Sequence, residues 1–131
     1  MSLKDYFANT SGFGVLSTAN SEGRVDAAVY ARPHVINDGN VAFIMAERLT
    51  HANLQSNPHA AFLFREEGEG YRGKRLFLTK TGEEKDTKRL MQLRRRGACD
   101  EEPEGRHLVF FQVDEVLPLV GAGETIVSAN A

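Results

Sequence analysis

The chain has 131 residues, of which 41% are hydrophobic and 26% are charged, and this predicts one packed domain rather than a disordered chain. A formal net charge of −2 excludes a general electrostatic attraction to nucleic acid or to an anionic membrane surface. The apolar runs are too short to span a bilayer, and the one cysteine, Cys99, excludes an internal disulfide, so we expect a cytoplasmic protein.

The first predicted element is a short helix. Ser2 is a good N-cap, and Asp5 follows it at the spacing of a capping box. Further along, Pro33 indicates an edge or a bend because it cannot donate a ladder hydrogen bond, and the residues from Asn37 to Asn40 predict a hairpin turn. The strands that we expect are residues 13–19, 25–35, 41–46, 60–65, 75–81 and 108–116.

Two more helices are predicted between these strands. One covers residues 50–57, with Thr50 as its N-cap and Pro58 as its stop, and the other covers residues 83–96 and ends at Gly97. The helices are inserted singly, without a repeated strand–helix–strand alternation. This pattern favours a mainly β fold, a six-stranded antiparallel barrel that is closed or nearly closed. We expect a single domain over residues 1–131, with a flexible tail at 121–131.

Several motifs resemble functional sites, but their sequence context argues against that role. The segment Gly68–Gly73 matches G-x-G-x-x-G, but it joins two predicted strands and is flanked by glutamates, so we interpret it as a flexible hairpin loop. The three arginines at 94–96 are interpreted as the solvated end of a helix. The histidines have no histidine or cysteine partner at metal-ligand spacing, so we expect no metal site.

The stretch from Arg48 to Pro58 is different. It follows a strand and opens a helix, where free N–H groups, the Thr50 hydroxyl and the Arg48 guanidinium can hold a phosphate. Arg32, toward the end of the second predicted strand (residues 25–35), can supply a second cation if that strand lies beside the third. Local chemistry alone leaves open the alternative of an ordinary capped surface helix with two solvated arginines.

The order of these segments resembles the FMN-binding split-barrel family related to pyridoxamine 5′-phosphate oxidase. A strand, the pattern Asn53-Leu54 and Asn57-Pro58 in a short helix, and the strand Ala60-Ala61-Phe62-Leu63-Phe64 stand in the family's order. The likeness covers roughly residues 3 to 117. It implies a six-stranded antiparallel split β-barrel of Greek-key type and a homodimer with FMN at the subunit interface.

The resemblance also implies roles for individual residues. Arg32 takes the place of a basic residue that meets the phosphate, and Met45 and Ala46 take places beside the isoalloxazine ring. The cofactor-binding residues expected in this way are Tyr30, Arg32, Met45, Ala46, Arg48, Thr50, His51, Asn53, Lys74 and Arg75. Thr50 stands where the family often has a lysine, and the chain lacks the C-terminal arginine-rich segment of the true oxidase, which argues against pyridoxamine-phosphate oxidase activity.

The function that we expect is that of an FMN-binding flavoprotein, an oxidoreductase that acts on a small molecule. The sequence does not identify a catalytic acid or base, although His51 is the best candidate for a proton relay. The alternative is a split-barrel carrier or sensor for haem or a deazaflavin, without catalysis. A small barrel that binds nucleic acid would need exposed aromatic side chains beside a basic groove, and we expect no nucleic-acid or membrane partner.

Overall fold

The computed structural model describes residues 2–85, 87–97 and 106–121. Its elements in chain order are α1 (Leu3–Asn9), β1 (Gly12–Ala19), β2 (Val25–Tyr30), β3 (His34–Asn37), β4 (Asn40–Ala46), α2 (Leu49–Ser56), β5 (His59–Glu66), β6 (Gly73–Lys85), α3 (Lys88–Gly97) and β7 (Arg106–Pro118). Cys99 and the tail from residue 122 onward lie outside the described residues.

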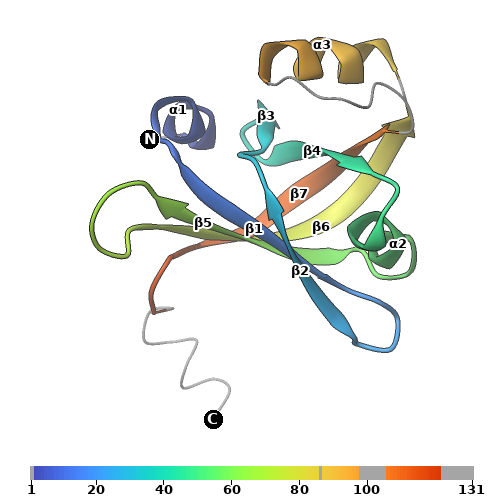
Figure 1. Cartoon of the computed structure of the whole chain (residues 1–131), viewed down its shortest axis with the longest axis horizontal. Helices are drawn as coiled ribbons and strands as arrows, with labels where there is room; N and C mark the ends of the chain where they lie inside the picture. Colours follow the sequence, from blue (N-terminus) through green and yellow to red (C-terminus); the bar gives the residue numbers. More distant parts are fainter. Residues whose placement is uncertain (1, 86, 98–105, 122–131) are drawn as a thin grey trace.

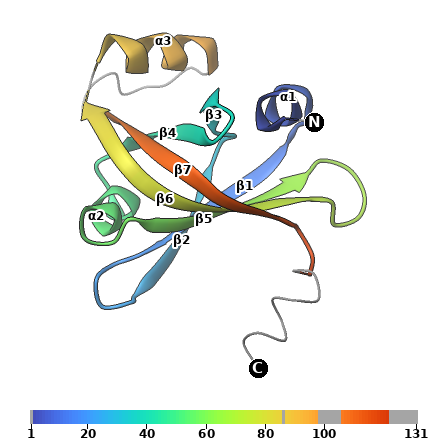
Figure 2. The same cartoon turned by 180° about the vertical axis from the view of Figure 1, so that it is seen from behind.

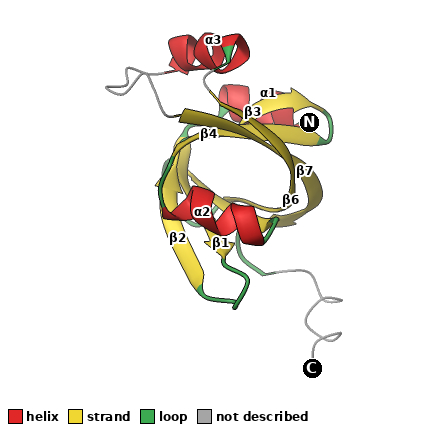
Figure 3. Cartoon of the chain, turned by 90° about the vertical axis from the view of Figure 1, so that its right-hand side faces the viewer, coloured by secondary structure: helices red, strands yellow, loops and turns green. Residues whose placement is uncertain are grey.

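The strands form one antiparallel sheet in the order β2-β1-β5-β6-β7-β4-β3. The sheet curls into a barrel whose ring of strands is seen in Figure 3, with α2 crossing in front of it, and β2 and β3 are its two edges. Strand β4 lies beside β7, and β7, β6 and β5 follow in turn, which is the order of a Greek key. The prediction of a mainly β antiparallel barrel is confirmed, but the described strands number seven and not six.

The additional strand comes from the segment 25–35, which we predicted as one strand. The structure divides it into β2, which pairs with β1, and β3, which pairs with β4. Pro33 stands at the break, where it cannot donate to a continuous ladder. The two halves therefore lie at opposite edges of the sheet, and the predicted turn at Asn37–Asn40 joins β3 to β4 (Figure 1).

Strand β6 is longer than predicted. It continues to Lys85, and its last residues pair with β7, with Glu83 opposite Val109 and Lys85 opposite His107. The predicted helix at 83–96 therefore begins only at Lys88, because long-range pairing outweighs the helix propensity of Glu83 and Glu84. This shift places Glu83 on the barrel wall.

The interior of the barrel is filled mainly by phenylalanine and leucine. Gly14, Leu16 and Thr18 face inward from β1, and the alternate residues of this strand face outward, as expected of a strand that is buried on one face. The largest fully buried side chains in the main core are Leu16, Phe43, Met45, Phe62, Phe64, Leu76, Leu78 and Phe111. A smaller cluster attaches α3 through Leu90, which packs with Ala42 and Leu108.

The helices lie around the barrel (Figures 1 and 2). Helix α1 begins as predicted, with the Ser2 hydroxyl accepting a 3.1 Å hydrogen bond from the Asp5 amide, and it buries Tyr6 and Phe7 against the core. The loop Gly68–Gly73 connects β5 to β6, as expected of a hairpin loop. Among the described residues, no helix is both long and apolar enough to cross a membrane.

Candidate functional site

The turn from β4 into α2 presents a helix N-terminus without a side-chain cap. The helix begins at Leu49, and Arg48 is the N-cap residue, in an extended conformation and without a capping hydrogen bond from its side chain. Thr50 was predicted as the cap, but it lies inside the first turn and is buried. The first N–H groups of α2 thus lie beside the exposed guanidinium of Arg48, an arrangement suited to an anion.

Tyr30 connects this turn to the neighbouring strands. Burial and the negative charge of Asp26 raise the pKa of the Tyr30 hydroxyl, while a hydrogen bond with Thr50 and the positive charges of Arg106 and Arg48 act in the opposite direction. Both guanidinium groups are therefore within the range of electrostatic interaction with the hydroxyl. Arg106 reaches this place because β7 pairs with β4, where it stands opposite Ala46.

We call the N-terminus of α2 together with Tyr30, Arg48, Thr50 and Arg106 the anion site. Sequence reasoning missed Arg106, since it follows a run of charged residues in the sequence and only the pairing of β4 with β7 brings it beside the turn. The two cations, the hydroxyl groups and the helix dipole all favour a phosphate over a neutral ligand.

Two other residues near this turn that were predicted to bind the cofactor, Met45 and Asn53, are buried and contribute to the fold. Met45 is 1% exposed, and its side chain belongs to the main core rather than to a ligand surface. The side-chain amide of Asn53 donates a 3.0 Å hydrogen bond to the Thr18 hydroxyl, and both groups are buried. Asn53 thus anchors α2 to β1, and it does not present its side chain at the surface.

Three cationic residues that were predicted to bind the cofactor, Arg32, Lys74 and Arg75, make their contacts away from the anion site of their own chain. Arg32 donates hydrogen bonds to the carbonyls of Phe7 and Thr10, both at 2.8 Å, and so secures the end of α1. Lys74 lies over the Tyr6 ring. Arg75 donates to the carbonyl of Pro118, the last residue of β7, and to the carbonyl of Gly121 beyond it.

The position of Lys74 and Arg75 on their strand explains this separation. Both lie at the start of β6, whereas the side chain that meets α2, Glu83, lies near its end. Lys74 and Glu83 are separated by nine positions, or roughly 30 Å of extended strand. One chain therefore does not bring Lys74 or Arg75 to its own α2.

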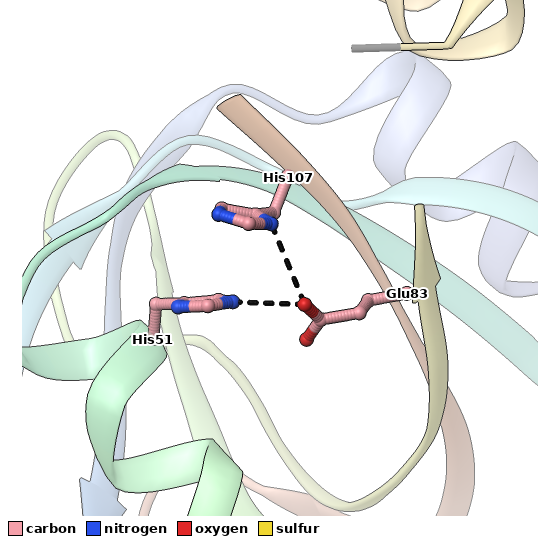
Figure 4. A group of neighbouring side chains, drawn as sticks. All are labelled: His51, Glu83 and His107. Carbon is pink, nitrogen blue, oxygen red and sulfur yellow. Dashed lines mark hydrogen bonds and ion pairs between the residues drawn. The ribbon is translucent and has the colours of Figure 1, made fainter. Parts of the chain in front are cut away.

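A second group of side chains lies just behind the anion site. His51 of α2, Glu83 of β6 and His107 of β7 converge, with their ligand atoms all within 4.8 Å of one another (Figure 4). His51 Nε2 lies 3.0 Å and His107 Nδ1 lies 3.4 Å from the same oxygen, Glu83 Oε2. The two imidazole rings stack, with their centroids 3.8 Å apart and their planes 18° apart. We call these three residues the His–Glu cluster.

The carboxylate of the His–Glu cluster is strongly stabilised in its charged form. Burial by itself raises the pKa of Glu83, but hydrogen bonds from Lys80, His51 and Gln55 outweigh this effect and lower the pKa to about 2. Lys80 Nζ lies 2.8 Å and Gln55 Nε2 lies 3.1 Å from Oε1. Glu83 is therefore an anion at neutral pH, with Oε2 turned toward the two histidines.

We expected no metal site because the histidines have no histidine or cysteine partner among their close neighbours in the chain. His51 and His107 are far apart in sequence, and Glu83 was placed in a helix rather than on β6. Continuation of β6 to Lys85, opposite His107, is what brings the three residues together. Residues 82–85 are Gly, Glu, Glu and Lys, none of them β-branched, so no local signal indicates that the strand extends beyond its predicted end.

No family model matches the chain, and no curated protein matches its sequence. Solved structures do match. An FMN-binding protein from Syntrophomonas wolfei subsp. wolfei superposes with a TM-score of 0.76 at 16% identity, over 90% of this chain and 84% of that one. An F420 reductase superposes with a TM-score of 0.70 at 14% identity, over 88% of this chain and 97% of that one.

HutZ, a heme storage protein from Vibrio cholerae, matches with a TM-score of 0.63 at 16% identity, over 90% of this chain and 95% of that one. Pyridoxamine 5′-phosphate oxidase-like proteins share the architecture as well. At these identities the likeness establishes a common fold, and the expected split barrel is thereby confirmed at the level of the fold.

Proposed function

We propose that this protein binds FMN, with the phosphate in the anion site, and that it is a flavin-dependent oxidoreductase acting on a small molecule. The observation that carries the proposal is the start of α2, where a helix N-terminus without a side-chain cap stands beside Arg48 and within reach of Arg106. A phosphate fits this donor set, since Arg106 supplies a charge where the family often has a lysine in place of Thr50. Structural similarity to an FMN-binding protein supports the choice of flavin.

We expect the residues of the anion site to contribute to FMN binding in different ways. Arg48 and the first N–H groups of α2 hold the phosphate, while Thr50 and Tyr30 orient it through their hydroxyl groups. Ala46, at the end of β4, lies next to the turn, where the backbone can pass close to a ring system. The flavin itself, when bound, supplies the transfer of a hydride or of electrons.

A homodimer is part of the proposal, and the outer face of the sheet supports it. Val15 stands between Val29 and Leu63 in the pairing register, and all three side chains project away from the core. Val29 is 68% exposed and Leu63 is 39% exposed, so an apolar strip crosses three adjacent strands. Lys74 and Arg75 can serve an FMN only if it is bound between two subunits, because they lie so far from α2 of their own chain.

The test is a titration of the purified protein with FMN and, in parallel, with riboflavin, which lacks the phosphate. Arg48→Gln is expected to weaken FMN binding by about 10- to 100-fold, the effect of losing a charge-assisted hydrogen bond. Riboflavin binding should hardly change. Arg24→Gln, an exposed arginine in the β1–β2 turn, is the matched control and should bind FMN like the wild type. Equal losses for both flavins would place the phosphate elsewhere.

A carrier or sensor for haem or a deazaflavin is the second candidate, because the fold is shared with HutZ and with an F420 reductase. Titrations with haemin and with F420 separate the candidates. A Soret band on addition of haemin, without quenching of FMN fluorescence, would favour the haem carrier. Bleaching of bound FMN by NADH or NADPH without oxygen would support an oxidoreductase.

A further inference from the structure

The donor atoms of the His–Glu cluster have the spacing of metal ligands. Zinc binds imidazole nitrogen and carboxylate oxygen at about 2.0–2.2 Å, so that two ligands of a tetrahedral ion are separated by about 3.4 Å. The nitrogen–oxygen distances observed are 3.0 Å from His51 and 3.4 Å from His107 to the shared Glu83 oxygen. The ring edges of both histidines face the same carboxylate (Figure 4).

The buried imidazole of His107 is independent evidence for a ligand in the His–Glu cluster. It is 6% exposed, and neither of its ring nitrogens makes a hydrogen bond to any described residue. The nearest carboxylates are longer contacts, Glu83 at 3.4 Å from Nδ1 and Glu47 at 3.5 Å from Nε2. Buried polar atoms without a hydrogen bond destabilise the fold, and a bound cation would offset this cost.

The surroundings position the carboxylate of Glu83 and place a second carboxylate beside His107. Lys80 and Gln55 both bind Oε1 of Glu83, which leaves Oε2 for the histidines. Glu47 lies beside Nε2 of His107, the position of the second carboxylate in the carboxylate–histidine–metal arrangement that orients many metal ligands. The three ligands come from three elements, α2, β6 and β7, and Glu83 and His107 have a second layer of contacts.

We propose that His51, Glu83 and His107 form a binding site for a divalent transition-metal ion of the zinc type. Two imidazoles and one carboxylate suit Zn²⁺, whereas Mg²⁺ and Ca²⁺ prefer sites built from oxygen ligands. Three protein ligands leave a fourth position for water or another small ligand. The lone pair of an imidazole nitrogen lies in the plane of its ring, so the lone pairs of two parallel rings do not point at one ion. The stacked rings of His51 and His107 must therefore turn relative to each other when a metal ion binds. None of its three side chains is among those assigned to the anion site.

The experiment uses the full chain, freed of any affinity tag and dialysed against a chelator. Isothermal titration with Zn²⁺ is expected to give one tight site per chain, and Co²⁺ as a spectroscopic substitute should give the intense visible absorption of a four-coordinate ion. Glu83→Gln and His107→Ala should each weaken Zn²⁺ binding by at least about 100-fold, more than the loss typical of a supporting residue. Mg²⁺ should neither bind nor raise the melting temperature.

His59→Ala is the matched control, since His59 is an exposed histidine on β5. It should bind Zn²⁺ like the wild type. Glu83→Gln conserves the size of the side chain, and melting of each variant without metal shows whether it is folded. The proposal is overturned if the folded wild type takes up no Zn²⁺ at one per chain, or if Glu83→Gln binds it as tightly as the wild type. It is likewise overturned if His59→Ala loses as much affinity as His107→Ala. FMN titration of the same samples reports on the anion site separately.

Discussion

The side-chain amide of Asn53 donates a buried 3.0 Å hydrogen bond to the hydroxyl of Thr18, and this bond links α2 to β1. Asn53-Leu54 is also part of the pattern on which the family resemblance rests. The amide in that pattern therefore has a structural function in this chain, since it positions the helix whose N-terminus forms the anion site.

Asn53→Ala is expected to lower the free energy of unfolding by about 1–3 kcal/mol, because it leaves the Thr18 hydroxyl buried without its donor. Urea denaturation measures the loss. Thr18→Ala and the double variant complete a mutant cycle, in which we expect a coupling energy above about 0.5 kcal/mol. Strictly additive effects would show that the hydrogen bond contributes nothing to stability.

Gly14→Ala is expected to destabilise the barrel by about 1–3 kcal/mol through overpacking. A Cβ atom at Gly14 would lie 2.4 Å from the Phe62 ring and 2.7 Å from the backbone oxygen of Tyr30. Gly39→Ala is the control, because no atom lies within 4 Å of a Cβ placed there. Thermal melting of both variants checks the prediction, and equal melting temperatures would contradict it.

The stability of the protein is expected to fall at alkaline pH through Tyr6. Its hydroxyl donates a 2.7 Å hydrogen bond to Glu66, and burial together with that carboxylate raises the Tyr6 pKa above its ordinary value of 10.0. A raised pKa in the folded state stabilises the fold below pH 10, and this stabilisation is lost as the pH rises from 10 toward the folded pKa.

Tyr6→Phe tests this expectation. At pH 7 the variant should be less stable by about 1 kcal/mol, the typical net contribution of a hydrogen bond. The difference from the wild type should shrink above pH 10, as measured by denaturant unfolding across the pH range. Tyr71→Phe, at an exposed tyrosine in the β5–β6 loop, should show no such trend. A constant difference at all pH values would exclude Tyr6 as the source.

Val29→Glu is expected to convert the proposed dimer into monomers, because it places a charge in the apolar strip formed by Val15, Val29 and Leu63. Sedimentation at several protein concentrations measures the state of association. Val120→Glu changes a side chain that is equally exposed, at 66%, but follows β7 and lies off the strip. A Val29 variant that associates like the wild type would place the dimer contact on another surface.

Much of the local structure could be predicted from the sequence because short-range signals determine it. Ser2 and Asp5 start α1, the Asn37–Asn40 segment turns the chain, and the loop Gly68–Gly73 connects two strands, all as expected. The mainly β antiparallel architecture also follows from short strands with single helices between them. In these cases the interacting residues are close neighbours in the chain.

The candidate sites could be predicted only in part. Arg48, Thr50 and Tyr30 were expected together and do lie together, but Arg106 was missed, and Arg32 is held by the carbonyls of Phe7 and Thr10.

The sequence by itself determined the class of fold, the helix after β4 and the position of Arg48 at its start, because helix ends and turns depend on a few adjacent residues. Only the tertiary structure decided that the segment 25–35 divides between two sheet edges and that β6 runs on to Lys85. Strand pairing joins residues that are distant in sequence, and its hydrogen bonds outweigh local helix propensity. The same pairing brings His107 opposite Lys85 and beside Glu83, and so creates the His–Glu cluster.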